Sequence, residues 1–500
     1  MEIDDSGRAG GFARRAAVGA VYLGGAQVIR VILTLLSAIV IAHFLSPADY
    51  GVVAMAAPVI GVITMFQDLG LGTATVQSRT LNDAEATGMF WVNTVASLAI
   101  AAALVAIAPF AAWFYGDYRA GYVTAAGALG VLLSGIALQH AALLNREMRF
   151  GISSAIDVIN AFTTFAVAAL LALWLRSYWA LILGTLAGTA VQTVLMWRSA
   201  KWMPGRISFT GASRFAKFSS GVTGFNLVNF ISRNADNILI AKAAGSASLG
   251  LYDRSYKLMM LPLQTLNGPL LRLLLPILSK MQDEPERYRR TFVFAIRAVG
   301  LITIPGVAIS AVLSNRLMPF LLGPAWTEAG PIFFWLGLAG LFNPVGNLTG
   351  LLFLSSGRTG PFFRWGLFSA IITVGGFAIG IPWGAEGVAA SLFFSTAVRM
   401  PLLFVYSVRG TGVKPLDLFR AQFEPIMGSL PAAALALKLE PYFDTVPLLC
   451  LSIAIAYGIT LLFALATEPG RRTVFGMYAI AKDSLKDLGA RVRKRPGLTD

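Results

Sequence analysis

Residues 17–45 read AVGAVYLGGAQVIRVILTLLSAIVIAHFL, an apolar run long enough to cross a lipid bilayer as one helix. Its polar residues follow helical spacing and form one stripe: Gln27, Arg30, Thr34 and Ser37. Arg30 lies near the middle of the run, so its guanidinium falls near the bilayer midplane, too deep to reach water easily. A charge at that depth costs roughly 2.5–3.5 kcal/mol even on lenient insertion scales. Stability does not require it, so the stripe indicates function.

A second apolar run, VVAMAAPVIGVITMFQDLGLGTATV at residues 52–76, follows the short turn SPADYG. Gln67 and Asp68 lie inside it, and Pro58 predicts a bend. An anion on this helix and a cation on the preceding one are both costly in a membrane, which again points to a polar functional site.

The composition extends this interpretation to the whole chain. Of its 500 residues, 56% are hydrophobic and 13% are charged, against about 25% charged in ordinary globular proteins. We therefore predict an all-α polytopic membrane protein with about fourteen transmembrane helices. The predicted spans are 17–45, 50–77, 89–115, 122–144, 152–174, 178–197, 217–244, 256–279, 292–314, 328–355, 361–383, 387–408, 421–439 and 446–467. The single cysteine, Cys450, excludes a disulfide within the chain.

The net charge of +15 is distributed unevenly along the chain. Most of the 40 Lys and Arg fall in the termini and in alternate loops, which is the positive-inside bias of a membrane protein with both termini cytoplasmic. Nucleic acid is therefore not an expected partner. The basic tail after Glu468 could lie against anionic lipid.

An internal repeat divides the chain into two lobes. A shift of 199 residues places the stretch from Arg30 over the stretch from Asn229 without a gap, and several apolar and small residues coincide. Because the equivalent helices lie six spans apart and enter from the same side, the repeat is parallel. We predict two pseudo-repeated lobes around a central cavity, plus two extra C-terminal helices. The expected boundaries are 1–197 for the N-lobe, 198–216 for a cytoplasmic linker, 217–408 for the C-lobe, 409–467 for the extra helices and 468–500 for the tail.

Three stretches carry a family resemblance: AHFLSPADYGVVAM at 42–55, FQDLGLGTATVQ at 66–77, and NADNILIAKAAGSASLGLYDRSYKLMMLPLQTLNGPLLRLLLPILSKMQ at 234–282. They resemble the polysaccharide transporter family of Wzx-type flippases, within the multidrug/oligosaccharidyl-lipid/polysaccharide exporter superfamily. Exopolysaccharide exporters of the colanic-acid and succinoglycan type are the most similar.

The resemblance implies a function. Such a protein moves undecaprenyl-diphosphate-linked oligosaccharide units across the bacterial inner membrane by alternating access, for exopolysaccharide, capsule or O-antigen synthesis. Spans 1, 2, 7 and 8 would line the cavity. The expected partners are this substrate, membrane lipids, and a polysaccharide polymerase with its co-polymerase.

Candidate binding residues follow from the chemistry of that substrate. Fixed guanidiniums can bind two phosphate oxygens at once through a bidentate contact, and amides can form hydrogen bonds with sugar hydroxyls. The candidates on the repeated stripes and nearby are Arg30, Arg233, Arg272, Gln27, Asn226, Asn229, Gln264 and Asn267. An ion pair or a hydrogen bond that joins two helices is the alternative role for each.

Acidic residues inside spans are candidates for ion coupling: Asp68, Asp236 and Asp157. Asp236 lies three residues from Arg233, so neutralising that arginine is an equal alternative.

Several function classes find no support in the sequence. It contains no P-loop and no cluster with metal-site spacing, and no loop is large enough for a catalytic domain. We therefore expect no enzyme, cofactor or metal. A multidrug or cation antiporter of the same superfamily is the second hypothesis, although its substrates favour acidic rather than arginine-lined cavities. A membrane polysaccharide polymerase is a third, and would need large outer loops.

Overall fold

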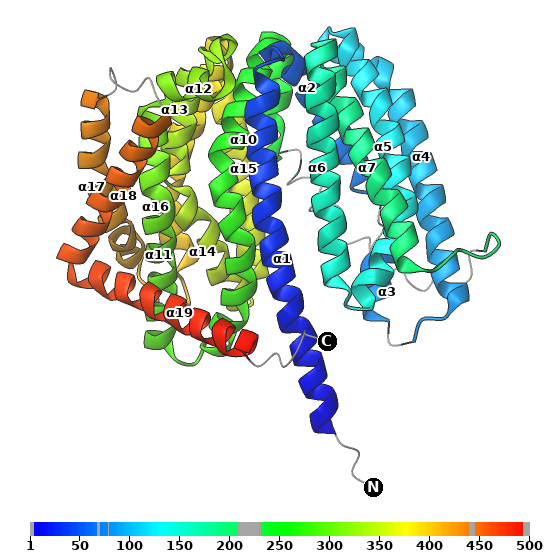
Figure 1. Ribbon diagram of the computed structural model, residues 1–500. Coiled ribbons are helices and arrows are strands. Elements are labelled where there is room, and N and C mark those ends of the chain that lie inside the picture. The colour runs from blue at the N-terminus through cyan, green and yellow to red at the C-terminus, as the bar shows by residue number, and fades with distance from the viewer. Residues whose placement is uncertain are drawn as a thin grey trace. The chain divides into compact units, whose positions relative to one another are not determined.

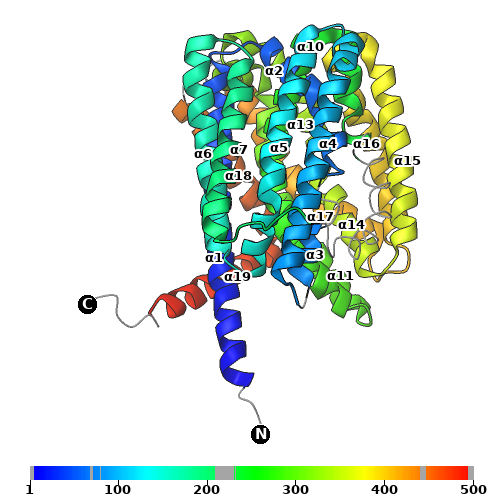
Figure 2. The same cartoon turned by 90° about the vertical axis from the view of Figure 1, so that its right-hand side faces the viewer.

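The computed structural model describes residues 5–67, 71–78, 80–208, 230, 232–439 and 446–493 (Figures 1 and 2). Within these ranges the chain forms helices and no strand. Nine of the described helical segments are long and apolar enough to cross a membrane. A tenth is reached if Leu451–Ala466 and Glu468–Ala479, which meet at a bend of 115°, count as one span. The predicted all-α polytopic fold is confirmed, whereas the number fourteen stays a prediction.

The chain divides into two compact units. Unit 1 comprises Met1–Arg254, Leu321–Trp326 and Phe377–Val388, and unit 2 comprises Ser255–Phe320, Thr327–Gly376 and Ala389–Asp500. This division differs from the boundaries predicted for the lobes, which stay a prediction. The predicted linker is described as far as residue 208. Its Gly205 carbonyl oxygen accepts a hydrogen bond from Trp91 Nε1 at 3.1 Å, and its amide donates to Thr87 Oγ1 at 3.2 Å. Both partners lie on the helix α4 (Asp83–Tyr115).

Before the linker, the described residues of unit 1 form seven helices (Figure 1): α1 (Asp5–Ala42), α2 (Pro47–Thr64), α3 (Leu71–Gln77), α4 (Asp83–Tyr115), α5 (Tyr118–Arg146), α6 (Phe150–Leu175) and α7 (Trp179–Ala200). Helix α1 packs on α6, α6 on α7, and α7 on α5, which also packs against α2, α3 and α4. Val52, Val123 and Ile182 form part of an apolar cluster that joins α2, α5 and α7.

Helix α2 begins with a capping box, in which Ser46 and Asp49 bond each other's backbone amides, and Pro47 occupies the first turn. The predicted span 50–77 is interrupted, because α2 ends at Thr64 and α3 begins at Leu71. Gln67 lies at the interruption and donates from Nε2 to the Val131 carbonyl oxygen of α5 at 2.8 Å. This bond anchors the chain where the helix stops.

Helix α10 (Ala235–Lys280) covers the end of one predicted span and all of the next. It is kinked at Gly245, whose φ of 79° lies in the region that glycine adopts without strain. The part up to Arg254 belongs to unit 1 and the rest to unit 2.

A reciprocal glycine contact inside unit 1 matches the internal repeat. A Cβ at Gly51 would lie 1.7 Å from the Ser246 carbonyl oxygen, and one at Gly250 would lie 1.8 Å from the Pro47 carbonyl oxygen. Pro47 and Ser246, like Gly51 and Gly250, are 199 positions apart. The contact is therefore the same on both sides, as a two-fold repeat requires.

Polar interactions lie near the glycine contact. Lys242 Nζ donates to the Phe114 carbonyl oxygen at 2.5 Å, and Arg119 Nη2 donates to Ser246 Oγ at 3.3 Å. Side-chain hydrogen bonds from the same arginine hold the pKa of Asp117, in the turn between α4 and α5, below its ordinary value. These bonds join the beginning of α10 to the turn between α4 and α5.

Most of unit 2 is built around α11 (Pro285–Val312), which packs on α13 (Ala329–Gly340), α14 (Asn343–Ser355), α17 (Pro415–Leu439), α18 (Val446–Ala466) and α19 (Glu468–Arg493). The remaining helices of the described residues are α12 (Ser314–Leu322), η1 (Pro324–Trp326), α15 (Thr359–Gly380), η2 (Ile381–Trp383) and α16 (Gly384–Ser407). Two ion pairs join α11 to α17: Arg289 with Asp417 at 2.6 Å, and Arg297 with Glu424 at 3.1 Å.

Candidate functional site

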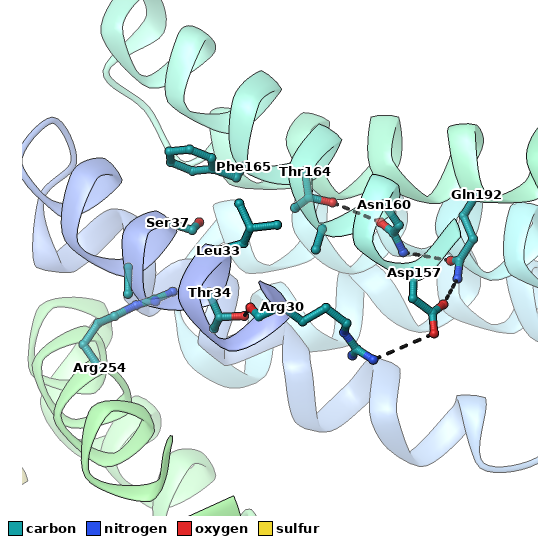
Figure 3. A pocket seen from close by; sticks show the side chains of 12 residues that line it. Arg30, Leu33, Thr34, Ser37, Asp157, Asn160, Thr164, Phe165, Gln192 and Arg254 are labelled. Atoms are coloured by element: carbon teal, nitrogen blue, oxygen red, sulfur yellow. Dashed lines mark hydrogen bonds and ion pairs between the residues drawn. The ribbon is translucent and has the colours of Figure 1, made fainter. Parts of the chain in front are cut away.

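A polar pocket of about 410 Å³ lies inside unit 1, between α1, α6, α7 and the unit 1 part of α10 (Figure 3). Eight polar side chains line it: Arg30, Thr34, Ser37, Asp157, Asn160, Thr164, Gln192 and Arg254. Leu33, Ala38, Ala161 and Phe165 complete the lining. So many polar groups among helices that can cross a membrane are costly unless they serve a ligand or one another.

Arg30 brings the predicted stripe of α1 to this pocket together with Thr34 and Ser37. Its side chain is 48% exposed, and Nη1 lies 3.8 Å from Oδ2 of Asp157 on α6. This distance is too long for a hydrogen bond, so the two groups attract each other electrostatically without a hydrogen bond between them. Thr34 Oγ1 is engaged within its own helix, where it donates to the Arg30 carbonyl oxygen at 2.8 Å.

A row of hydrogen bonds on α6 and α7 holds Asp157 in place (Figure 3). Gln192 Nε2 donates to Asp157 Oδ1 at 3.1 Å, and Asn160 Nδ2 donates to Gln192 Oε1 at 2.8 Å. Thr164 Oγ1 in turn donates to Asn160 Oδ1 at 3.2 Å. Gly188 leaves space for this row, because a Cβ there would lie 2.0 Å from Thr164 Oγ1. The carboxylate is thus positioned independently of Arg30.

Arg254 supplies a second guanidinium to the pocket. Its carbon Cζ lies 3.8 Å from the centre of the Tyr50 ring, a cation–π contact that fixes the head group. Tyr50 is buried and packs edge-on against Trp326 at 5.3 Å between ring centres. Nε of Arg254 is buried and has no hydrogen-bond partner within the described part of the chain. An unsatisfied cationic donor in a pocket is suited to an anionic ligand.

Sequence reasoning missed Arg254. The span predicted at 256–279 begins just after it, so the residue was assigned to a loop. In the structure α10 runs through this position and carries the side chain to the pocket. No pattern in the sequence distinguishes it from a loop arginine, because its repeat equivalent, 199 positions earlier, is Met55.

The other predicted binding residues are not brought together at this pocket. Gln27, Arg233 and Arg272 are exposed and do not line it. Asn226 and Asn229 lie outside the described residues, as do the side chains of Gln264 and Asn267. Their roles in binding stay predictions.

The predicted ion-coupling carboxylates lie in different surroundings. Asp157 lines the pocket, whereas Asp68 lies outside the described residues. Asp236 is buried, and its Oδ2 accepts a hydrogen bond from Tyr252 Oη at 2.9 Å. Within the described residues it makes no ion pair with Arg233, and both of its proposed roles stay predictions.

Among the described residues, the charges that line the pocket sum to +1, from two guanidiniums and one carboxylate. Such an excess of positive charge attracts an anion. Hydroxyl and amide groups between the two cations could bond uncharged polar parts of the same ligand.

Comparison with known proteins identifies the family. The pattern of the family described as polysaccharide biosynthesis protein matches residues 40–331. The chain belongs to this family. Within it, the chain is 23% identical over 454 residues to the lipopolysaccharide biosynthesis protein WzxC of Escherichia coli (strain K12), covering 89% of this chain and 87% of that protein. It is 24% identical over 343 residues to the succinoglycan biosynthesis transport protein ExoT of Rhizobium meliloti (strain 1021), covering 68% and 69%.

A solved structure shows a similar fold. The lipid II flippase MurJ, in an inward closed conformation, matches with a TM-score of 0.73 and 14% identity, covering 89% of this chain and 98% of that one. This member of the polysaccharide biosynthesis family is thus a multi-pass membrane protein with the fold of a flippase, and the predicted resemblance is confirmed.

Proposed function

We propose that this protein is a flippase for undecaprenyl-diphosphate-linked oligosaccharide units of exopolysaccharide, capsule or O-antigen, and that it works by alternating access. The observation that carries the proposal is the pair of guanidiniums, Arg30 and Arg254, in one polar pocket that is lined by α10 and by three helices long and apolar enough to cross a membrane, α1, α6 and α7. The names of the relatives support it, since WzxC and ExoT are biosynthesis and transport proteins of bacterial polysaccharides. MurJ, with a similar fold, is a flippase for a lipid.

The pocket chemistry agrees with a diphosphate head group. Such a group brings roughly two negative charges at neutral pH, and each charge-assisted hydrogen bond contributes about 1.5–3 kcal/mol. A small cationic drug would instead be repelled by the net positive charge, which disfavours the multidrug antiporter. The hydroxyls of Thr34 and Ser37 and the amide of Asn160 are suited to sugar hydroxyls.

The remaining predicted residues keep their roles in this proposal. Arg233 and Arg272 are further proposed contacts for phosphate oxygens, and Gln27, Asn226, Asn229, Gln264 and Asn267 bond sugars. Asp68, Asp157 and Asp236 are the carboxylates proposed to couple transport to an ion gradient. Transport involves no catalytic residue.

The proposal places the protein in the bacterial inner membrane with both termini cytoplasmic. This orientation puts the loading side of the pocket on the cytoplasmic leaflet. The basic tail lies against anionic lipid, and a polymerase with its co-polymerase receives the flipped unit.

Polymer secretion in a strain that lacks the gene tests this function. We expect Arg30→Ala to weaken loading by about ten- to a hundredfold, because one charge-assisted contact is lost. Arg30→Lys should retain partial activity, since it keeps the charge but not the two-pronged geometry. Arg233→Ala and Arg272→Ala test the proposed phosphate contacts of these two arginines in the same way.

Arg364→Ala is the matched control, because Arg364 is exposed on α15 and lines no part of this pocket. Immunoblots of membranes check that all variants are equally abundant. Normal secretion by a well-expressed Arg30→Ala protein would contradict the proposal.

A further inference from the structure

We propose that Asp157 is a built-in counter-ion that competes with the anionic head of the substrate for Arg30. It would thereby set how tightly the pocket holds the substrate and how fast it releases it. The inference rests on the proposed function, because it concerns the same pocket.

The first support is the looseness of the ion pair. Arg30 Nη1 and Asp157 Oδ2 are 3.8 Å apart, and the two side chains are 48% and 39% exposed. In unit 2, by contrast, the Arg289 guanidinium donates two hydrogen bonds to the Asp417 carboxylate, at 2.7 and 2.6 Å. Two donor groups of Arg289 are therefore occupied by Asp417. The guanidinium of Arg30, by contrast, makes no hydrogen bond within the described residues. Its donors remain available to a ligand.

The second support is that Asp157 does not depend on Arg30 for its position. Gln192 donates to one carboxylate oxygen and is itself held by Asn160, so the row on α6 and α7 persists when the guanidinium turns away. A carboxylate without such support would lose its orientation when the substrate arrived. Here it stays in place and is ready to attract Arg30 again when the substrate leaves.

A selective binding site follows from these two features. A diphosphate can bond Arg30 with two charges and short contacts, and it outcompetes a single carboxylate at 3.8 Å. A neutral head group brings no charge to replace that of the carboxylate, so it gains little from Arg30. The carboxylate thus disfavours ligands that carry no negative charge.

The test measures binding of farnesyl diphosphate to the purified full-length protein in lipid nanodiscs, with Kd and the dissociation rate as readouts. Asp157→Asn should lower Kd about five- to tenfold, mainly through slower dissociation, because the competing charge is gone while an acceptor for Gln192 remains. The gain should be lost in an Arg30→Ala background. The matched control is Glu147→Gln, which removes one negative charge at an exposed position that pairs with Arg149 instead.

The possible results separate the two proposals. An unchanged or higher Kd for Asp157→Asn, with clear binding by the wild type, would overturn the counter-ion and leave the flippase proposal standing. A gain that persists in full without Arg30 would also overturn it, because it would reflect general repulsion. If neither the wild type nor Asp157→Asn binds the diphosphate, both proposals fail.

Discussion

Two arginines define the pocket at the scale of single residues, and they are held differently. Arg30 faces a loosely paired carboxylate, whereas Arg254 stacks on the ring of Tyr50. A cation–π contact is worth up to about 2 kcal/mol when it is desolvated, and it leaves the N–H groups at the edge of the guanidinium free for a ligand. Tyr50 is therefore a positioning residue for Arg254.

Substitutions of Tyr50 test this role. Tyr50→Phe keeps the ring and removes a buried hydroxyl that has no partner among the described residues, so we expect normal secretion and equal or higher thermal stability. Tyr50→Leu removes the ring and should reduce secretion several-fold at equal abundance. Secretion assays and melting temperatures of the purified variants check both expectations. Equal secretion by the Leu and Phe variants would show that the ring does not position Arg254.

The sequence allowed one of these arginines to be predicted and not the other. Arg30 lies inside a long apolar run, where any charge is conspicuous. Arg254 lies in a stretch rich in polar residues, DRSYK, where one more charged residue does not stand out from its neighbours. Its placement depends on α10 continuing past the kink at Gly245, which is a property of packing rather than of hydropathy.

At the scale of elements, the glycine contact between α2 and α10 is the tightest constraint on unit 1. Each glycine faces the backbone of the other segment, so no side chain can move aside to make room. The internal repeat identified these positions as equivalent, but it gave no indication that they touch. Sequence periodicity reports which residues share a face, and it does not report which faces meet.

We expect Gly51→Ala and Gly250→Ala to destabilise the protein by about 1–3 kcal/mol, because the added methyl group clashes with backbone. Gly458→Ala on α18 is the control, since nothing lies within 4 Å of a Cβ there. That change should be neutral or stabilise by up to about 1 kcal/mol through helix propensity. Thermal unfolding of the purified proteins measures the difference. Similar melting temperatures for all three variants would argue against a close contact.

At the scale of the whole molecule, hydropathy predicted an all-α membrane protein and missed where the helices are interrupted. The span predicted at 50–77 is two helices, and the region from 328 to 355 holds α13 and α14. Interruptions within a predicted span arise from proline, glycine and local hydrogen bonds, to which a window of mean hydropathy is insensitive. The basic tail also forms a helix, α19, which carries Phe475 and Tyr478, 60% and 64% exposed, beside Arg471 and Arg472.

The orientation of the chain is the remaining prediction at this scale. The positive-inside bias places Gly205 and Lys482 in the cytoplasm and Tyr118 on the opposite side. All three are exposed, so a cysteine at any of them can be labelled when a reagent reaches it. In a Cys450→Ser background, a membrane-impermeant thiol reagent should label Tyr118→Cys in intact cells. It should label Gly205→Cys and Lys482→Cys only after the membrane is permeabilised. Labelling of either cytoplasmic position in intact cells would reverse the assignment, and the pocket would then load its substrate from the other leaflet.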